Sequence, residues 1–387
     1  MLTDNNEIMR GVIDDGTFYI DDGVLLKYNG SDARVVIPEG VREIGCSVFE
    51  WNLTLEEVVI PNGVFDIGDS AFACCKNLKR VVIPDGVTGI DRQAFLGCES
   101  LEYIDIPDSV ENIGCFAFRE SGLVSFTVPP AVRAIESYTF EGCDHLREIV
   151  IPDGVSEIGF NAFNRCEELK RVHIPASVEK ISSGTFSHCT HLLEITVAED
   201  NPCYSSIDGN LYSKSGNTLH QYAIGKSDES FTVPDGVVTI TDMAFFYGKN
   251  LVNINIPDSV TEIGLSTFFR CENLERVNIP AKIKQLRPFL FSECHKLKEV
   301  KIPETVTSLG MCVFSGCKCV DEIIIPRAVD FIADYAFSDC GTQLKIYAEE
   351  GMDITDFGKK WNGTYTVLEL GTNRIVQEGK EDGDSVF

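Results

Sequence analysis

The chain has 387 residues, with 60 acidic against 33 basic side chains and a formal charge of −27. That sign argues against a surface for nucleic acid or for an anionic membrane, because phosphate binding requires clustered Lys and Arg. With 44% hydrophobic and 24% charged residues, the composition is that of a folded globular protein and excludes a disordered chain.

Twelve of the 15 prolines recur at a nearly constant spacing of 23 residues. These prolines are Pro38, Pro61, Pro84, Pro107, Pro129, Pro152, Pro175, Pro234, Pro257, Pro280, Pro303 and Pro326. One gap is 22 residues long, and one is 59 residues long, in which Ala198 holds the missing position and 13 extra residues follow. A fixed period in this range indicates a solenoid of stacked repeats.

Other residue types keep the same phase. Phenylalanine lies eleven residues after each of these prolines, cysteine often lies at fourteen and leucine at seventeen. The unit from Leu78 to Cys98 has the form LxxVxIPxxVxxIxxxAFxxCxx. Its LxxVxI part alternates inward and outward, which predicts a short strand that ends at the proline. The stretch opened by Asp91, around Ala94 and Phe95, predicts a helix of one or two turns that is held by stacking.

The unit resembles the BspA-like leucine-rich repeats, also called the Treponema pallidum type, over about residues 17 to 370. The resemblance implies an α/β repeat solenoid, which is a right-handed leucine-rich-repeat superhelix with a continuous parallel β-sheet on one face and 23-residue repeats. It also implies a binding or surface scaffold, because members of this family resemble one another as scaffolds with diverse partners.

In chain order we expect five parts. They are an N-terminal cap with a β-hairpin (1–33), a first repeat block (34–200), an inserted β-hairpin (201–230), a second repeat block (231–348) and a C-terminal cap (349–387). In the C-terminal cap, 348–361 is expected to be a helix and 364–370 a strand, and the polar tail after Gly371 is expected to be frayed.

The inserted hairpin resembles the start of the chain. Residues 206–213 and 218–223 flank the turn at 214–217, which has the composition of a hairpin. The segment IDDGVLLKYNG at 20–30 resembles IDGNLY at 207–212. We therefore interpret the insertion as a second N-terminal cap, at which the array bends or widens but does not break.

The strand face is the candidate binding surface, because it is the usual contact surface of repeat solenoids. Its outward positions form an outer column four residues before each proline and an inner column two residues before it. Signs alternate in the outer column, as in Glu57 with Arg80, which is typical of cross-strand pairing. The inner column is apolar toward the N-terminus. The candidate protein-binding residues are Val59, Val82, Tyr103, Asp105, Val150, Arg171 and His173. Exposed β-branched residues also follow from strand propensity alone, so a face that binds nothing is the alternative.

Catalytic and metal motifs are weak. His188, Cys189 and His191 form a cluster only in sequence, because Cys189 belongs to the inward column. The segment 312–319 contains three cysteines but lacks a fourth zinc ligand. Gly225-Lys226-Ser227 is not a phosphate loop, since residue 220 is His and a strand is expected where a helix should begin. We expect no enzyme, no cofactor and no metal.

The cysteines are expected to be reduced. Nine of the 15 lie in one column, and parallel Cβ atoms about 4.8 Å apart exceed the ~3.8 Å of a disulfide. Buried thiols of this kind pack as small hydrophobes and donate weakly to backbone carbonyls. With no signal peptide and no transmembrane run in the sequence, a cytoplasmic location is favoured, while the family resemblance leaves surface display or non-classical secretion open.

These patterns favour a non-enzymatic, monomeric leucine-rich-repeat scaffold for protein-protein interaction, through the strand face or the inserted hairpin. The partner is expected to be a protein and neither nucleic acid nor a membrane interior. The alternative is a structural or cell-surface coat protein without a defined groove ligand.

Overall fold

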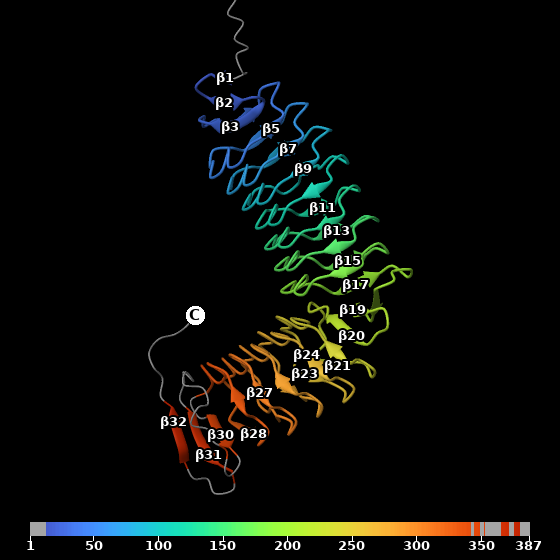
Figure 1. The fold of residues 1–387 in the computed structure, drawn as a ribbon, viewed down its shortest axis with the longest axis vertical. Coiled ribbons are helices and arrows are strands. Elements are labelled where there is room, and N and C mark those ends of the chain that lie inside the picture. Colours follow the sequence, from blue (N-terminus) through green and yellow to red (C-terminus); the bar gives the residue numbers. More distant parts are fainter. Residues whose placement is uncertain (1–12, 342–343, 349–351, 353–364, 371–374, 380–387) are drawn as a thin grey trace, which may run out of the picture. The chain divides into compact units, whose positions relative to one another are not determined.

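The computed structural model describes residues 13–341, 344–348, 352, 365–370 and 375–379. The chain forms two compact units, Met1–Phe186 and Ser187–Phe387. Within each unit, successive coils place short parallel strands side by side in two rows, as Figure 1 shows. Each unit is therefore a β-solenoid.

The N-terminal unit starts with three antiparallel strands, and its coils then supply the two rows. The antiparallel strands are β1 (Ile13–Asp14), β2 (Phe18–Asp21) and β3 (Val24–Tyr28). The first row, which precedes the prolines, comprises β4 (Arg34–Val36), β6 (Glu57–Val59), β8 (Arg80–Val82), β11 (Ser125–Thr127), β13 (Glu148–Val150) and β15 (Arg171–Ile174). The second row comprises β5 (Glu43–Ile44), β7 (Asp66–Ile67), β9 (Gly89–Ile90), β10 (Asn112–Ile113), β12 (Ala134–Ile135), β14 (Glu157–Ile158) and β16 (Lys180–Ile181).

The C-terminal unit has the same plan. It begins with β17 (Glu194–Val197) and the antiparallel strands β18 (Tyr204–Ile207), β19 (Asn210–Ser213) and β20 (Thr218–Gln221). Its first row is β21 (Ser230–Thr232), β23 (Asn253–Asn255), β25 (Arg276–Val277) and β28 (Glu322–Ile325). Its second row is β22 (Thr239–Ile240), β24 (Glu262–Ile263), β26 (Gln285–Leu286), β27 (Ser308–Leu309) and β29 (Phe331–Ile332). It ends with β30 (Leu344–Ala348), β31 (Tyr365–Glu369) and β32 (Ile375–Gly379).

The expectation of an α/β fold was wrong, because the described residues contain no helix. The stretch around Ala94 and Phe95 is a series of turns, in which Gln93 (φ 58°) and Gly97 (φ 65°) adopt the left-handed conformation that ends a helix. The N–H of Phe95 donates to the carbonyl of Ala117 in the next coil at 2.8 Å and makes no helical bond. Bonds between coils thus replace bonds within a helix.

The expected continuous sheet is also interrupted. In the N-terminal unit the first row contains the sheets β4-β6-β8 and β11-β13, and the second row contains a break between β10 and β12. Paired residues do follow the 23-residue period, as in Glu57 opposite Arg80 and Asp66 opposite Gly89. The 23-residue period therefore continues through positions where the ladder of hydrogen bonds between strands is interrupted.

The phenylalanine column forms the centre of each unit. From Phe49 to Phe186 and from Phe245 to Phe337, neighbouring rings stack with centroids 5.0–5.9 Å apart. These rings are at most 1% exposed. A tyrosine heads each stack, Tyr28 on Phe49 at 5.0 Å and Tyr222 on Phe245 at 5.2 Å.

The inserted segment differs in detail from the expected hairpin. The expected arm 206–213 is split by a turn, so that β18 pairs with β19 and β19 pairs with β20, both antiparallel. The two-residue turn Asp208-Gly209 (φ 49° and 71°) has the same conformation as Asp22-Gly23 between β2 and β3 (φ 48° and 80°). Positive φ at both positions is the turn that fits the twist of a hairpin.

At the far end, β31 matches the expected strand at 364–370 and pairs parallel with β30. The tail was expected to be frayed after Gly371, but β32 lies there and pairs antiparallel with β31. The expected helix at 348–361 falls almost wholly outside the described residues.

Candidate functional site

The first-row face of the N-terminal unit brings two of the predicted residues, Val59 and Val82, into register with a third valine, Val36. Val36, Val59 and Val82 end the neighbouring strands β4, β6 and β8 and lie opposite one another. Val36 is 55% exposed, whereas Val59 and Val82 are half-buried. Outward Val is favoured on a pleated strand, and the buried Val35, Val58 and Val81 alternate with it toward the core.

Tyr103 and Asp105 lie in the next coil, where the first-row sheet is interrupted. Neither belongs to a strand, and Glu102 donates its N–H locally to the carbonyl of Ser100 at 3.1 Å. Asp is disfavoured in strands, so Asp105 in the place of a valine weakens this segment of the row. Tyr103 is 60% exposed and lies in the outer column, one period after Arg80, whereas Asp105 follows Val82 in the inner column.

The remaining predicted residues lie further along the same face. Val150 is the last residue of β13, pairs with Thr127 of β11 and is 45% exposed. Arg171 and His173 are exposed residues of β15. The inner column therefore carries separate apolar side chains on both sides of the break.

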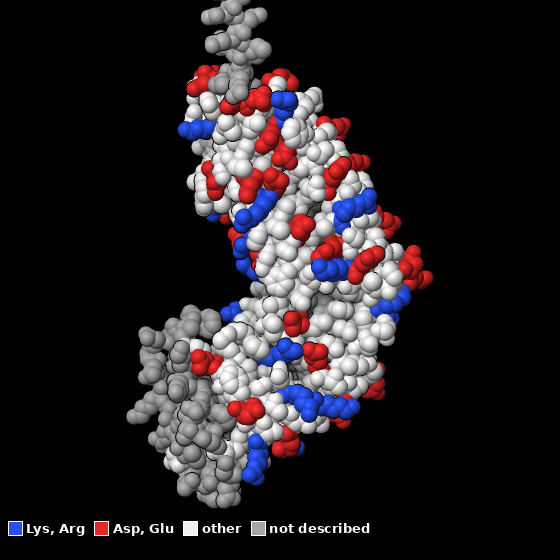
Figure 2. Space-filling view, in the orientation of Figure 1, with Lys and Arg blue, Asp and Glu red and all other residues white. Residues whose placement is uncertain are grey.

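In the outer column of the same face, Glu57 forms ion pairs with its neighbours on both sides, Arg34 and Arg80. Glu57 accepts from Arg34 Nε at 3.3 Å and from Arg80 Nη1 at 3.2 Å. Such exposed pairs contribute about 0–1 kcal/mol each, so they set charge more than stability. Figure 2 shows acidic side chains spread over the visible N-terminal unit with basic ones interspersed. Because these charged side chains pair with one another, the exposed apolar side chains of the inner column are what distinguishes this face.

A groove of about 590 Å³ lies on the second row, at the break between β10 and β12. Asp91, Glu111, Glu136 and Arg133 contribute its charged groups. Burial raises the pKa of Asp91, with a further contribution from a neighbouring carboxylate. We did not predict this groove, although the sequence holds its signal, because it coincides with the single 22-residue spacing of the prolines.

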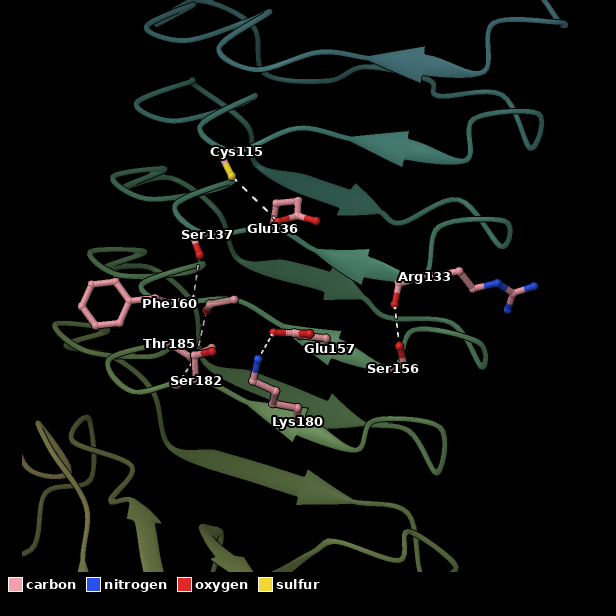
Figure 3. A network of polar contacts seen from close by, with 11 residues as sticks. Cys115, Arg133, Glu136, Ser137, Ser156, Glu157, Phe160, Lys180, Ser182 and Thr185 are labelled. Carbon is pink, nitrogen blue, oxygen red and sulfur yellow. Dashed lines mark hydrogen bonds and ion pairs between the residues drawn. The ribbon is translucent and has the colours of Figure 1, made fainter.

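Cys115 lines this groove, and Figure 3 shows its contact with the carboxylate of Glu136. The sulfur lies 3.8 Å from Glu136 Oε2. Burial and the carboxylate both raise the pKa of Cys115, which keeps the thiol protonated and disfavours nucleophilic chemistry. Beyond the groove the coils are joined by polar contacts such as Lys180 to Glu157 and Ser156 to the carbonyl of Arg133.

The cysteine column has a structural role, as expected from the sequence. Its thiols donate to the carbonyl of the phenylalanine 25 or 26 residues earlier at 3.0–3.2 Å, in Cys75, Cys98, Cys143, Cys166, Cys271, Cys294, Cys317 and Cys340. Burial raises the pKa of Cys75, Cys143 and Cys271 to about 12. The thiols are hydrogen-bond donors within the core.

The other cysteine and histidine motifs do not form a site. Cys189 is buried, and the ring of His188 packs on Tyr247 with centroids 3.7 Å apart. Cys312 and Cys317 are buried while Cys319 is exposed. Within the described ranges, no three His, Cys, Asp or Glu side chains are grouped so that they could hold a metal ion. Lys226, from the segment that imitates a phosphate loop, donates to the carbonyl of Asp208 and covers the ring of Tyr222.

One family model matches the repeat pattern that gives the stacked coils and their cysteine and phenylalanine columns. The BspA type leucine rich repeat region matches residues 27–133, 111–227 and 222–343, with six copies of the repeat. The chain belongs to the BspA-type leucine-rich-repeat family. The resemblance inferred from the sequence is confirmed, and the chain is a repeat-protein scaffold of that family.

Solved structures of other leucine-rich-repeat proteins resemble this BspA-type chain. A leucine rich cell surface protein from Faecalibacterium prausnitzii A2-165 is 34% identical, with 88% of this chain and 95% of that chain covered and a TM-score of 0.79. The pneumococcal vaccine antigen PcpA is 17% identical, with coverages of 93% and 99% and a TM-score of 0.67. A leucine-rich repeat protein from Bacteroides ovatus ATCC 8483 is 22% identical, with coverages of 92% and 97% and a TM-score of 0.59. The last two likenesses establish the fold alone.

Among curated proteins, no sequence matches this BspA-type chain. Across the described residues, no helix has the length and the apolar character that a membrane crossing requires.

Proposed function

We propose that this BspA-type protein is a non-enzymatic scaffold that binds a protein partner through the first-row strand face of its N-terminal unit. One observation carries the proposal. Glu57 of the outer column is paired with both Arg34 and Arg80, while Val36, Tyr103 and Val150 stay 45–60% exposed on the same face. Exposed apolar side chains on a face with paired charges are the composition of an interface centre.

On binding, each of these residues would gain about half of the free energy of full burial, so together they would supply part of the affinity alongside further contacts. Full burial of one large apolar side chain contributes about 1.5–3 kcal/mol, and these residues are half exposed before binding. An aromatic residue such as Tyr103 is among the types most often found at energetic centres of interfaces. The proposal includes no catalysis, no cofactor and no metal, and a monomer as the binding form.

The experiment is affinity capture with the immobilised full-length chain, followed by titration of any captured protein after purification. The test variant combines Val36→Ser, Tyr103→Ser and Val150→Ser, which are exposed and leave the core unchanged. We expect the partner to be lost from the capture and its Kd to rise at least about tenfold, or 1.4 kcal/mol.

The matched control combines Trp51→Ser, Leu53→Ser and Phe65→Ser, which remove equally exposed apolar side chains elsewhere in the same unit. It should retain the partner. Equal loss in both variants, with unchanged thermal unfolding, would show that the first-row face has no special role.

The alternative is a structural or cell-surface coat protein. It is favoured by the 34% identical relative, which is described as a leucine rich cell surface protein. A coat protein without a groove ligand predicts that no captured protein depends on Tyr103 or its neighbours. The same capture experiment therefore separates the two functions.

A further inference from the structure

One coil of this acidic chain is strongly basic. Residues 280–302, which we call the basic coil, contain six Lys or Arg side chains and two Glu, a net charge of +4. The coils on either side, 257–279 and 303–325, each carry a net charge of −2. The excess of positive charge is therefore confined to a stripe one coil wide in the C-terminal unit.

Most of this charge is not neutralised within the unit. Arg287 pairs with Glu262 at 2.9 Å, and Lys298 pairs with Glu275 at 2.8 Å. The other four basic side chains are exposed and form no ion pair with any described residue: Lys282, Lys284, Lys296 and Lys301. Unpaired lysines beside acidic coils are free to meet an anion from outside the chain.

Three of these lysines lie around one corner between the two strand rows. The hydroxyl of Thr305 donates at 2.7 Å to the carbonyls of both residues that flank Lys282, which fixes the adjacent coils at this corner. Lys301 lies at the end of the basic coil, four residues before Thr305 of the next coil, and Lys284 lies two residues after Lys282. Ile283 between these two is buried, so both lysines point outward.

The width of the stripe selects the kind of anion. Neighbouring coils are about 5 Å apart, and the major groove of a DNA duplex alone is about 12 Å wide. A duplex or a membrane surface would place phosphates against the carboxylates of the coils on both sides. A single extended chain fits a stripe of one coil.

Two exposed apolar side chains lie in the two coils that follow the stripe. Ile324, one period after Lys301, is 50% exposed. Phe331 of β29, 58% exposed, lies two strands from Gln285, the neighbour of Lys284. An anionic glycan has no apolar side chains for these contacts. We propose that the basic coil binds an extended acidic peptide segment that carries apolar residues, on a surface separate from the first-row face of the N-terminal unit.

The experiment measures fluorescence anisotropy of a labelled twelve-residue peptide that alternates Glu with Leu or Phe, titrated with the full-length chain. We expect binding that weakens as NaCl rises, because exposed charge pairs are screened. The variant Lys282→Glu, Lys284→Glu, Lys301→Glu should bind at least about tenfold more weakly. Binding that ignores both salt and this variant would overturn the proposal.

The matched control is Lys214→Glu, Lys249→Glu, Lys318→Glu, which changes the net charge equally at exposed positions of the same unit. It should bind the peptide within about twofold of the wild type. An equal loss in this control would assign the effect to total charge. Heparin and an all-Glu peptide serve as competing probes, and displacement by either at equal affinity would refute the apolar part of the recognition.

Discussion

The stacked phenylalanine column makes a quantitative prediction about Phe163. Its ring is fully buried and lies between Phe140 and Phe186, with centroids 5.4 and 5.6 Å away and planes within 4° of parallel. Phe163→Ala removes both stacked contacts, each contributing about 0.5–1.5 kcal/mol beyond area burial, and leaves a cavity that rigid coils fill poorly. We expect a loss of about 3–5 kcal/mol in the free energy of unfolding.

The assay is urea unfolding followed by far-UV circular dichroism and by tyrosine fluorescence. Phe65→Ala is the matched control, since Phe65 is 49% exposed, and it should cost under about 1 kcal/mol. Arg171→Ala on the surface should also cost under about 1 kcal/mol. Equal losses for Phe163→Ala and Phe65→Ala would refute the register of the column and the nearest-neighbour stacking drawn from it.

Four further substitutions test the polar groups. Burial, and after it the neighbouring carboxylates, raises the pKa of Asp66 to about 6, so ionisation of this side chain opposes folding at pH 7. In urea titrations, Asp66→Asn should therefore stabilise the protein by about 1 kcal/mol at pH 7 and by little at pH 4. Burial lowers the pKa of His220 from 6.5 to about 4. The free energy that the neutral imidazole contributes to folding is therefore complete above pH 6.5 and is lost as the pH falls toward 4. His220→Gln should remove up to about 3 kcal/mol of this pH dependence from the free energy of unfolding. The Tyr222 hydroxyl is buried without a hydrogen-bond partner, whereas Tyr28 donates to Asp32 at 3.2 Å. In thermal unfolding Tyr222→Phe should therefore stabilise by about 1 kcal/mol and Tyr28→Phe should destabilise by a similar amount.

The periodic sequence was sufficient to predict the solenoid, its buried columns and its family. A residue such as Phe95 is identified by its phase relative to the prolines, and that phase also places it in the core. The prediction of a helix was wrong, because each coil contains residues in the left-handed backbone conformation and their residue types do not indicate that conformation. Gln93 and Arg165 are ordinary residues with φ 58° and 62°. The N–H of Gln93 donates to the carbonyl of Cys115 in the next coil at 3.1 Å and holds Gln93 in this conformation, and no local sequence pattern predicts such a bond.

The candidate site was predicted in part. The strict 23-residue spacing of Val36, Val59 and Val82 implies their register, and the structure has it. The break at Tyr103 depends on whether two neighbouring coils complete a ladder of hydrogen bonds, and that depends on backbone geometry at the ångström level. The acidic groove coincides with the 22-residue spacing, whose consequence in space cannot be derived from a count alone.

A regular solenoid cannot place a specific site by its repeat, because translation by one coil maps every surface residue onto an equivalent one. Specificity therefore requires positions where the repeat is violated. The violations here are of separate kinds: a strand lost at Tyr103, a coil shortened before Pro129, an insertion led by the Asp208-Gly209 turn and a reversal of charge at 280–302. The Pro, Phe and Cys columns keep their phase through most of these violations, so the core remains stacked while the surface changes. Binding surfaces on this scaffold can accordingly differ from coil to coil at little cost to its stability.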